Sequence, residues 1–397
     1  MKILMLTPYV PYPPSSGGQI RTFNLLKYLS KRHQITLIAL YKNEEEKKYK
    51  KFLNPYCKQI YLCQRPPKPW TFKNIFRAIF SFYPFLVIRN FSEEAKKLIE
   101  NILNKENFDV IHAETFYVMP HIPETKIPIV LVEQTIEYKV YQHFLNSLPL
   151  IIQFFLYFDI LKLIHWERFY WRKASIVGTV SGTDEKVIKE LEKNIKTALI
   201  PNGAGDEMIV KKLPKKNLKN PLIIFQGNFN WLQNIEAAKF LINQIFPLLI
   251  KIHPNIKLLI SGQNADKIKI SRNSKIEIIN LSLDKTYMVK SLYQKATIFI
   301  APIFGPGGTR LKILAAMASG LPVISSPTGV EGLAVEDGKH VLIAKNEKEF
   351  VKKILLLLKN KNFYESLRKN AYQLVLSKYN WKKIAEKLGR IYQQLKK

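Results

Sequence analysis

The chain has 397 residues, of which 47% are hydrophobic and 23% are charged, which excludes a disordered protein and exceeds what one ordinary core requires. Its 62 basic and 31 acidic residues give a formal net charge of +31. The excess indicates either lysine spread over solvated faces or an anionic partner, such as a membrane surface or a phosphorylated substrate.

The N-terminal region predicts a parallel sheet. KILML and ITLIAL are short apolar strands, and QIRTFNLLKYLSKRH between them has apolar residues at helical spacing. A strand–helix–strand unit of this kind implies parallel strands. The connecting loop reads SSGGQ and lacks the GxGxxG pattern of dinucleotide-binding proteins. Further strands are expected at 108–114, 127–134 and 174–181, the last followed by a helix with Thr183 as its N-cap.

The segment 148–173, LPLIIQFFLYFDILKLIHWERFYWRK, mixes aliphatic and aromatic residues with basic residues near its end. Two interpretations stay open, an interfacial helix at a membrane and a buried helix with a solvated end. The longest uncharged stretch, 140–158, contains too many polar residues for a spanning helix. The apolar run 3–6 is too short for a signal peptide, so we expect none.

A polar, basic segment with two prolines, 201–218, predicts a linker between two domains. A second α/β series follows, with a helix expected at 234–250 and a terminal amphipathic helix at 379–397. We therefore expect two doubly wound Rossmann-like domains, at 1–200 and 219–378. The strands of the second domain are expected at 222–227, 256–262, 275–280, 296–302, 321–326 and 340–344.

The stretch GPGGTRLKILAAMASGLPVIS, 305–325, predicts an anion site. Its glycines and Thr309 precede a helix that begins near Arg310, just past the carboxyl end of strand 296–302. Helix N-termini carry unpaired N–H groups and partial positive charge, and Arg310 or Lys312 would add to it. We expect a phosphate or diphosphate there. The alternative is a glycine-rich turn in which Thr309 caps the helix and nothing binds.

The loop after the first strand has the same arrangement. Gly17 and Gly18 follow a strand end and precede a helix, so a second phosphate-facing loop or a flexible connection is expected. Two such sites, one in each domain, would face each other across a cleft. At the other end of the helix in 305–325, Gly320 is expected as the C′ residue that ends it.

The sequence gives little support for metal binding or nucleic-acid binding. The seven histidines and the two cysteines, Cys57 and Cys63, lack metal-ligand spacing, so we expect no metal and two free thiols. The lysines are dispersed and no known nucleic-acid-binding motif occurs, so we expect no nucleic acid. His112 and Glu114 end the strand 108–114, where a polar residue with a purely structural role is the more common finding.

Residues 307–333, GGTRLKILAAMASGLPVISSPTGVEGL, resemble the GGTRxKILEAMAxGxPVVST…GxEGL signature of a bacterial branch of family 4 glycosyltransferases, which have the GT-B architecture. KILMLTPYVPYPPSSGGQIR, VSGTDEKVI, LIPNGAG and FQGNFNWLQNIEAAKF extend the resemblance over nearly the whole chain. It implies a retaining hexosyltransferase without a metal cofactor, with the acceptor bound by the first domain and a nucleotide-sugar donor by the second. The terminal helix would cross back onto the first domain.

The resemblance also implies roles for individual residues. Gly17 and Gly18 would face the donor phosphates, and Asn228 would line the donor side. His112 and Glu137 are the catalytic candidates in the first domain. The diphosphate would be met by, or lie near, Gly308, Thr309, Arg310, Lys312, Val330 and Glu331.

Two positions depart from the family pattern. Ala315 stands where the family has a glutamate that bonds the nucleotide ribose, and Gln134 stands where the acceptor domain has a histidine. One hypothesis is an active enzyme that transfers sugar to a glycan or lipid-linked acceptor in cell-envelope polysaccharide synthesis, cytoplasmic and peripheral at the inner membrane face. The other is a degenerate homologue that binds nucleotide, glycan or a partner protein without catalysis.

Overall fold

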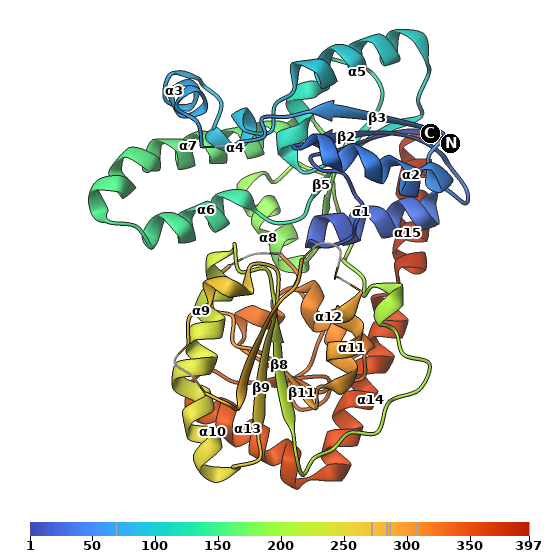
Figure 1. Ribbon diagram of the computed structural model, residues 1–397. Helices are drawn as coiled ribbons and strands as arrows, with labels where there is room; N and C mark the ends of the chain where they lie inside the picture. Colours follow the sequence, from blue (N-terminus) through green and yellow to red (C-terminus); the bar gives the residue numbers. More distant parts are fainter. Residues whose placement is uncertain (69, 271–272, 283–284, 286, 307, 397) are drawn as a thin grey trace. The chain divides into compact units, whose positions relative to one another are not determined.

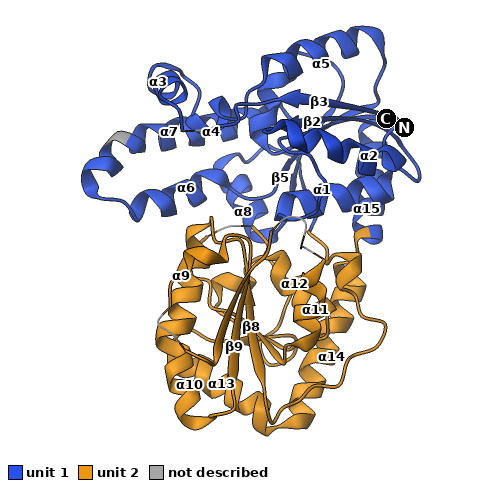
Figure 2. Ribbon diagram, viewed as in Figure 1, with its two compact units in different colours: residues 1–201, 382–397 blue, residues 202–381 orange. Residues whose placement is uncertain are grey.

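The protein is described by a computed structural model that covers residues 1–68, 70–270, 273–282, 285, 287–306 and 308–396. The chain divides into two compact units, unit 1 with residues 1–201 and 382–397, and unit 2 with residues 202–381 (Figure 2). Each unit contains one parallel sheet flanked by helices (Figure 1), which confirms two Rossmann-like α/β domains. The expected cleft between them stays a prediction.

The sheet of unit 1 has seven strands in the order β3-β2-β1-β4-β5-β6-β7. The order reverses at β1, where β1 pairs in parallel with both β2 and β4. Ligands of such sheets bind beyond the carboxyl ends of the strands at this reversal. The strands are β1 (Lys2–Thr7), β2 (Gln34–Tyr41), β3 (Gln59–Gln64), β4 (Val110–Glu114), β5 (Ile129–Glu133), β6 (Ile176–Thr179) and β7 (Thr197–Leu199).

The helices of unit 1 include five that the sequence did not predict, α2, α3, α4, α5 and α6. Helix α8 begins after Ser181, whose hydroxyl accepts the N–H of Asp184 at 3.0 Å, so Thr183 as its N-cap was wrong. Ser181 has the extended backbone that a capping residue needs. The helices are α1 (Gly17–Leu29), α2 (Lys50–Leu53), α3 (Phe72–Phe80), α4 (Phe85–Ile88), α5 (Glu93–Lys105), α6 (Glu137–Asn146), α7 (Leu150–Lys173), α8 (Gly182–Leu191) and α15 (Trp381–Lys396).

The C-terminal helix α15 joins unit 1 from Lys382 on, which confirms that the chain returns to its first domain. The Tyr392 hydroxyl lies 2.6 Å from His112 Nδ1, and Lys396 Nζ lies 2.8 Å from Asp109 Oδ1. These contacts fasten the C-terminal helix to β4 and to the residue before it.

The sheet of unit 2 has six parallel strands in the order β10-β9-β8-β11-β12-β13, with its reversal at β8. The helix expected at 234–250 is α9, a π-helical segment (Leu241–Ile245) and α10, with Pro247 in the first turn of α10 removing one backbone donor. The remaining elements are β8 (Leu222–Gln226), α9 (Leu232–Phe240), α10 (Phe246–Ile252), β9 (Lys257–Gly262), β10 (Ile276–Asn280), α11 (Met288–Lys295), β11 (Ile298–Ala301), α12 (Leu311–Ala318), β12 (Val323–Ser325), β13 (Leu342–Ile343), α13 (Glu347–Lys359) and α14 (Lys361–Lys378).

The segment expected as a linker is packed into unit 2 from residue 202 on, so the linker prediction needs correction. Ala204 and Met208 are buried in the core of unit 2. The Val210 N–H donates to the carbonyl of Ala318 at 3.2 Å. These few apolar residues anchor a segment whose overall composition is polar, which is why composition alone misplaced it.

Helix α12 ends at a Schellman motif, as its sequence predicts. Gly320 adopts φ +70°, and its N–H donates to the carbonyl of Met317 at 3.0 Å. The Leu321 N–H donates to the carbonyl of Ala316 at 2.9 Å. Gly320 as the C′ residue is confirmed.

Glu133 and Glu167 are fully buried where α6 and α7 leave the core of unit 1, and the half-buried Glu137 lies beside them. The fully buried Glu167 accepts the N–H groups of Glu137 (2.8 Å) and Tyr138 (3.1 Å), and so caps α6. Glu133, also fully buried, accepts the indole N–H of Trp171 at 2.8 Å. Burial raises the pKa of Glu133 to about 8; the Trp171 hydrogen bond opposes this shift, and the charge of Glu137 adds to it.

We expect Glu133→Gln to stabilise the protein increasingly as the pH rises. A carboxyl with a raised pKa in the folded state costs stability progressively from about pH 4.5 to about pH 8, because the unfolded chain ionises first. A glutamine side chain at this position keeps an acceptor for Trp171 and cannot ionise. The difference between the melting temperature of Glu133→Gln and that of the wild type should therefore become more positive from about pH 4.5 to about pH 8.

The control is Glu45→Gln, at an exposed glutamate outside the core. Its melting temperature should follow that of the wild type at every pH. A Glu133→Gln difference that does not change with pH would contradict the raised pKa.

Candidate active site

The carboxylate of Glu114, the last residue of β4, is the centre of a buried polar network in unit 1. Its oxygens lie 3.4 Å from Arg21 Nε and 2.9 Å from His112 Nε2, and accept the Gln134 amide at 2.6 Å. These groups come from α1, β4 and the loop after β5. The network therefore lies at the carboxyl ends of the strands around the reversal of the sheet, where this fold binds ligands.

Glu114 is ionised within this network. Burial acts to raise the pKa of Glu114, but the charge of Arg21 and the hydrogen bond and charge of His112 outweigh it and hold this pKa at about 2. Both Arg21 and Glu114 are fully buried. Arg21 Nη1 also donates to the carbonyl of Ile200 at 3.1 Å, so this side chain connects α1 both to β4 and to the residue after β7.

Gly18 lets the start of α1 approach this network closely. A Cβ atom at Gly18 would lie 2.5 Å from the Tyr9 hydroxyl and 2.8 Å from Gln134 Oε1. The Gln134 amide in turn donates to the Tyr9 hydroxyl at 2.8 Å. Gly17 is exposed at the same helix start, and Ser16 caps it. The structure thus gives Gly18 a packing role, and the phosphate-facing role of both glycines stays a prediction.

His112 is fully buried, and both of its ring nitrogens face protein groups, Glu114 on one side and Tyr392 on the other. The ring connects β4 to α15 and orients the Glu114 carboxylate. This geometry makes His112 a positioning residue. Because both ring nitrogens contact protein groups and the ring is buried, the geometry does not support its predicted catalytic role.

Glu137, the first residue of α6, is half-buried. Burial raises the pKa of Glu137 to about 7, and the charge of Arg89 acts against that shift. A carboxyl group that titrates near neutral pH suits proton transfer. The predicted catalytic role of Glu137 stays a prediction.

In unit 2, Lys312 and Asn234 meet above the carboxyl end of β8. Lys312 Nζ donates to Asn234 Oδ1 at 2.6 Å and lies 5.0 Å from the centre of the Phe225 ring. A Cβ atom at Gly227 would lie 3.0 Å from Nζ, so the absence of a side chain at this position makes room for the ammonium group. Burial, and then the charge of Arg310, lower the pKa of Lys312 to about 7. An anion at this position would restore its full positive charge.

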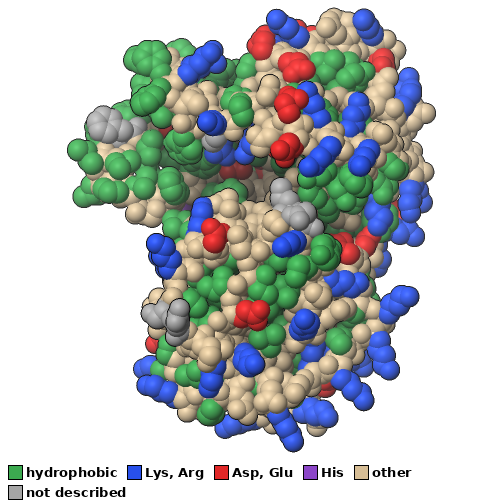
Figure 3. All heavy atoms as spheres, viewed as in Figure 1, with side chains coloured by type: hydrophobic (Ala, Val, Ile, Leu, Met, Phe, Trp, Pro, Cys, Tyr) green, Lys and Arg blue, Asp and Glu red, His purple; other side chains and the backbone are tan. Residues whose placement is uncertain are grey.

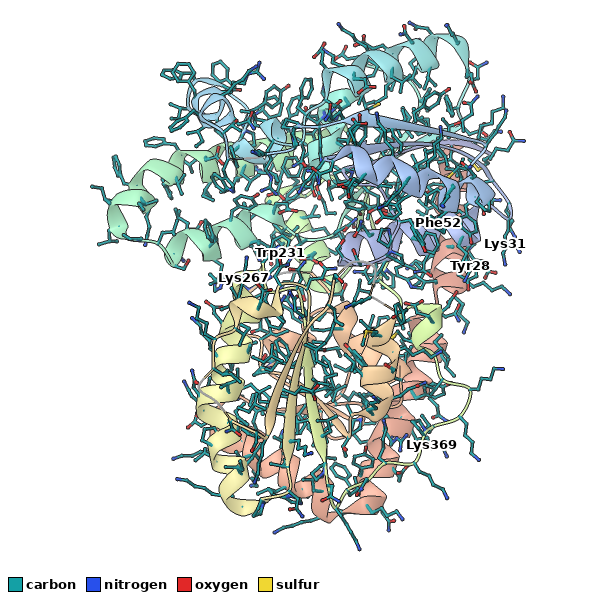
Figure 4. All side chains as sticks on the ribbon, viewed as in Figure 1. Tyr28, Lys31, Phe52, Trp231, Lys267 and Lys369 are labelled. Atoms are coloured by element: carbon teal, nitrogen blue, oxygen red, sulfur yellow. The ribbon has the colours of Figure 1, made fainter. Side chains whose placement is uncertain are left out.

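Side-chain amides continue this cluster. Asn234 donates to the carbonyl of Asn228 at 2.7 Å, and the Asn228 amide donates to Gln263 Oε1 at 2.8 Å. Asn264 donates to Asn228 Oδ1 at 3.2 Å. Asn228 is therefore held in a fixed orientation beyond β8. Trp231, half of whose surface is exposed, lies near the same end of unit 2 (Figure 4).

The start of α12 differs in one respect from its prediction. The Thr309 hydroxyl accepts the Asn202 amide at 2.9 Å, and Arg310 occupies the N-cap position, so Thr309 as the cap was wrong. Arg310 Nη2 donates to the carbonyl of Gly305 at 2.7 Å. Gly308 is half-buried beside them, and Gly307 lies outside the described residues.

Val330 and Glu331 follow the carboxyl end of β12, which pairs with β11. Val330 is buried at the end of a short 3-10 turn (Thr328–Val330), and Glu331 is exposed. The predicted donor residues of unit 2 therefore follow strands β8, β11 and β12, at one edge of one sheet. Their contact with a donor stays a prediction.

The sequence did not predict several residues of the two polar networks. Tyr392 lies 280 residues from its partner His112, and nothing local marks it. Arg21 and Tyr9 flank the predicted loop without a distinguishing pattern. Asn234 gave a usable signal, because the helix expected at 234–250 begins with it. Among the described residues, no group of three or more His, Cys, Asp or Glu residues is placed to hold a metal ion.

We expect Arg21→Met to destabilise unit 1 by about 3–5 kcal/mol, because it leaves the buried Glu114 carboxylate without its ionic partner. Chemical denaturation at neutral pH measures the loss. Arg32→Met, at an exposed arginine just beyond α1, is the matched control and should change little. An equal and small effect of both substitutions would argue against the buried ion pair.

The comparisons with known proteins agree with this architecture. The model of Glycosyltransferase Family 4 matches residues 15–207, and the model of Glycosyl transferases group 1 matches residues 220–360. An uncharacterised 44.6 kDa protein in the cps region of Klebsiella pneumoniae is 27% identical over 396 residues, which cover 96% of this chain and 97% of that protein.

Solved structures share the fold at low sequence identity. Sucrose-phosphate synthase from Thermosynechococcus elongatus aligns over 100% of this chain and 99% of its own, with a TM-score of 0.73 and 16% identity. HepE from Anabaena, in complex with UDP and glucose, aligns over 99% and 100%, with a TM-score of 0.66 and 14% identity. The first matched range lies in unit 1 up to residue 201 and the second lies wholly in unit 2, and the chain belongs to the family 4 glycosyltransferases.

Proposed function

We propose that the protein is an active, retaining hexosyltransferase that moves a sugar from a nucleotide-sugar donor to a glycan or lipid-linked acceptor in cell-envelope polysaccharide synthesis. The observation that carries the proposal is the Lys312–Asn234–Asn228 cluster beside the glycine-lined start of α12. The UDP bound by HepE supports a nucleotide donor, and the cps-region relative supports polysaccharide synthesis.

The donor diphosphate would bind at the N-terminus of α12. Backbone N–H groups around Gly308 and the partial charge of the helix favour an anion. Arg310 and Lys312 add two side-chain cations on the same edge of the sheet. These residues would supply the positive charge that transferases of other types obtain from a metal, so we propose transfer without one.

In the reaction, an acceptor hydroxyl oxygen bonds to the anomeric carbon while the bond from that carbon to the diphosphate breaks. The nucleoside diphosphate leaves with the bonding electrons, and the hydroxyl proton passes to a base. We assign the holding of a proton near neutral pH to Glu137 and the orientation of the Glu114 carboxylate to His112. Retention places the new bond on the face of the sugar that the diphosphate leaves.

A second candidate is a degenerate homologue that binds nucleotide without catalysis. Ala315, half-buried on α12, offers no carboxylate for the ribose. Gln134, by contrast, bonds both Tyr9 and Glu114, so its position still serves the polar network. We therefore favour the active enzyme.

We also propose that the enzyme works in the cytoplasm, as a peripheral protein at the inner membrane face. The net charge of +31 supports attraction to an anionic membrane. A lipid-linked acceptor would be presented at such a surface.

Incubation with a panel of UDP-, GDP- and ADP-sugars and a lipid acceptor extract tests activity. We expect release of nucleoside diphosphate from at least one donor. Arg310→Ala should reduce the rate about ten- to a hundred-fold, because it removes a charge that stabilises the leaving group. UDP binding without release from any donor would favour the degenerate homologue.

We expect UDP binding to take up protons above about pH 7, because the pKa of Lys312 is about 7 in the free protein and an anion raises it. UDP affinity should therefore fall as the pH rises past this value. Calorimetry in buffers of different ionisation enthalpy measures the uptake.

Lys312→Met should lose both the proton uptake and the pH dependence of UDP affinity. Lys295→Met, at an exposed lysine of α11, is the matched control and should keep both. Unchanged proton uptake in Lys312→Met would show that this ammonium does not meet the diphosphate.

A further inference from the structure

We propose that α3 and the first half of α7 form a surface that inserts into the interface of a bilayer containing anionic phospholipid. We call it the apolar surface, and it consists of the exposed side chains Trp70, Phe72, Ile75, Phe76, Ile79, Phe80 and Phe82, and Leu150, Ile151, Ile152, Phe154, Tyr157, Phe158 and Leu161. The inference rests on the proposed peripheral position at a membrane, and it names the side chains that would enter the bilayer.

Helix α3 is amphipathic with its apolar stripe outward. Phe72, Ile75, Phe76, Ile79 and Phe80 follow helical spacing, and between 38% and 94% of each side chain is exposed. On its inner side, the buried Asn74 donates to the carbonyl of Lys68 at 3.2 Å, and Thr71 accepts the Asn74 N–H. A helix that packs on its own domain shows the opposite arrangement, with its apolar stripe inward.

Helix α7 carries a second stripe. Leu150, Ile151, Phe154, Phe158 and Leu161 recur at intervals that place them along one side of its first half. The exposed apolar residues that the structure describes in this half have between 42% and 82% of their side chains in solvent. Helices α6 and α7 extend away from the sheet of unit 1 (Figure 1), and hydrophobic side chains gather over α3, α6 and α7 (Figure 3).

Polar contacts from α7 hold the α3 segment in this orientation. Lys162 Nζ donates to the carbonyls of Ala78 and Ser81, both at 2.7 Å. Asp159 accepts the N–H of Phe85 at 2.8 Å and so caps α4. The exposed backbone ends around α3 and α4 thus find their partners on α7, and the apolar side chains are left to face outward.

Aromatic stacking reinforces the attachment. The rings of Tyr83 and Trp166 stack at 4.3 Å between centroids, and the Trp166 indole donates to the carbonyl of Phe82 at 2.8 Å. Trp70 stacks on the buried Phe85 at 4.6 Å. The two stripes therefore belong to one fixed part of unit 1.

The charges around the apolar surface fit anionic phospholipid. Residues 65–92 contain no aspartate or glutamate, residues 138–161 contain only Asp159, which caps α4, and both segments carry basic residues. Lys73 and Arg77 are exposed on α3 between its apolar residues. Exposed aromatic and aliphatic side chains flanked by cations are typical of helices that lie in a membrane interface.

An interfacial position also agrees with the helix composition. Within the described residues, no helix is both long and apolar enough to cross a bilayer. A helix with one apolar side and a polar, fastened opposite side can bury the apolar side at the level of the headgroups. A lipid surface needs no matching shape, which suits two stripes with large, protruding rings.

Co-sedimentation of the full chain with vesicles of phosphatidylcholine and phosphatidylglycerol, without donor or acceptor, tests the proposal. We expect binding that weakens with salt but persists in high salt, because apolar burial is not screened. The triple variants Phe72→Ser/Phe76→Ser/Phe80→Ser and Leu150→Ser/Phe154→Ser/Phe158→Ser should each bind at least about tenfold more weakly. The emission of Trp70, obtained by difference from Trp70→Phe, should shift to the blue on binding.

The matched control is Ile252→Ser/Leu356→Ser, which removes two exposed apolar side chains from unit 2 and should bind as the wild type does. All substituted side chains are exposed, so equal melting temperatures check that the variants fold. Wild-type binding by both triple variants would overturn the proposal. The proposal would also be overturned if the wild type does not bind these vesicles and instead forms a dimer that both triple variants prevent. A protein that binds vesicles but releases no nucleotide would disprove the proposed activity alone.

Discussion

The buried ion pair between Arg21 and Glu114 organises the first domain. A carboxylate removed from water is tolerated only when charge and hydrogen bonds replace its hydration. Glu114 meets this requirement with groups from α1, from its own strand and from the loop after β5. Through His112 it also reaches Tyr392, near the end of the chain. One charge therefore fixes the relative positions of four segments at the carboxyl edge of the sheet.

In the second domain the buried charge is a cation, the ammonium group of Lys312. Lys312 is held by an amide oxygen and an aromatic ring, and no carboxylate of the described chain forms a salt bridge with it. Its lowered pKa expresses the cost of that arrangement. An anionic ligand would relieve the cost, so binding energy and the protonation of Lys312 are coupled. This contrast between a carboxylate paired with Arg21 and an ammonium without a carboxylate partner among the described residues is the reason that we propose the ligand site in unit 2.

The sequence predicted the elements whose signal is local. Apolar runs such as KILML and ITLIAL, and the glycine at position 320, correspond directly to β1, β2 and the end of α12. The edge strand β3 was missed, because QIYLCQ has polar residues among its apolar ones. Helix α3 was missed for a different reason, since its apolar stripe faces solvent and its place depends on Lys162 and Trp166, more than eighty residues away.

The candidate sites show the same division. The residues after strand ends in unit 2 could be predicted, because strand ends and glycines are visible in sequence. The network around Glu114 could not, because Arg21, Gln134 and Tyr392 are joined only by the fold. Ala315 and Gln134 stand out only against a family pattern. The structure adds that the Gln134 amide donates hydrogen bonds to Tyr9 and Glu114, which the sequence alone could not show.

The central claim is that the second domain holds the donor diphosphate at the start of α12. Hydrogen–deuterium exchange with and without UDP tests it most directly, since it locates binding independently of turnover. The account predicts slower exchange in residues 226–234 and 308–313, with little change around α3 and α7. Protection confined to the first domain, or no protection at all when UDP is bound, would contradict it.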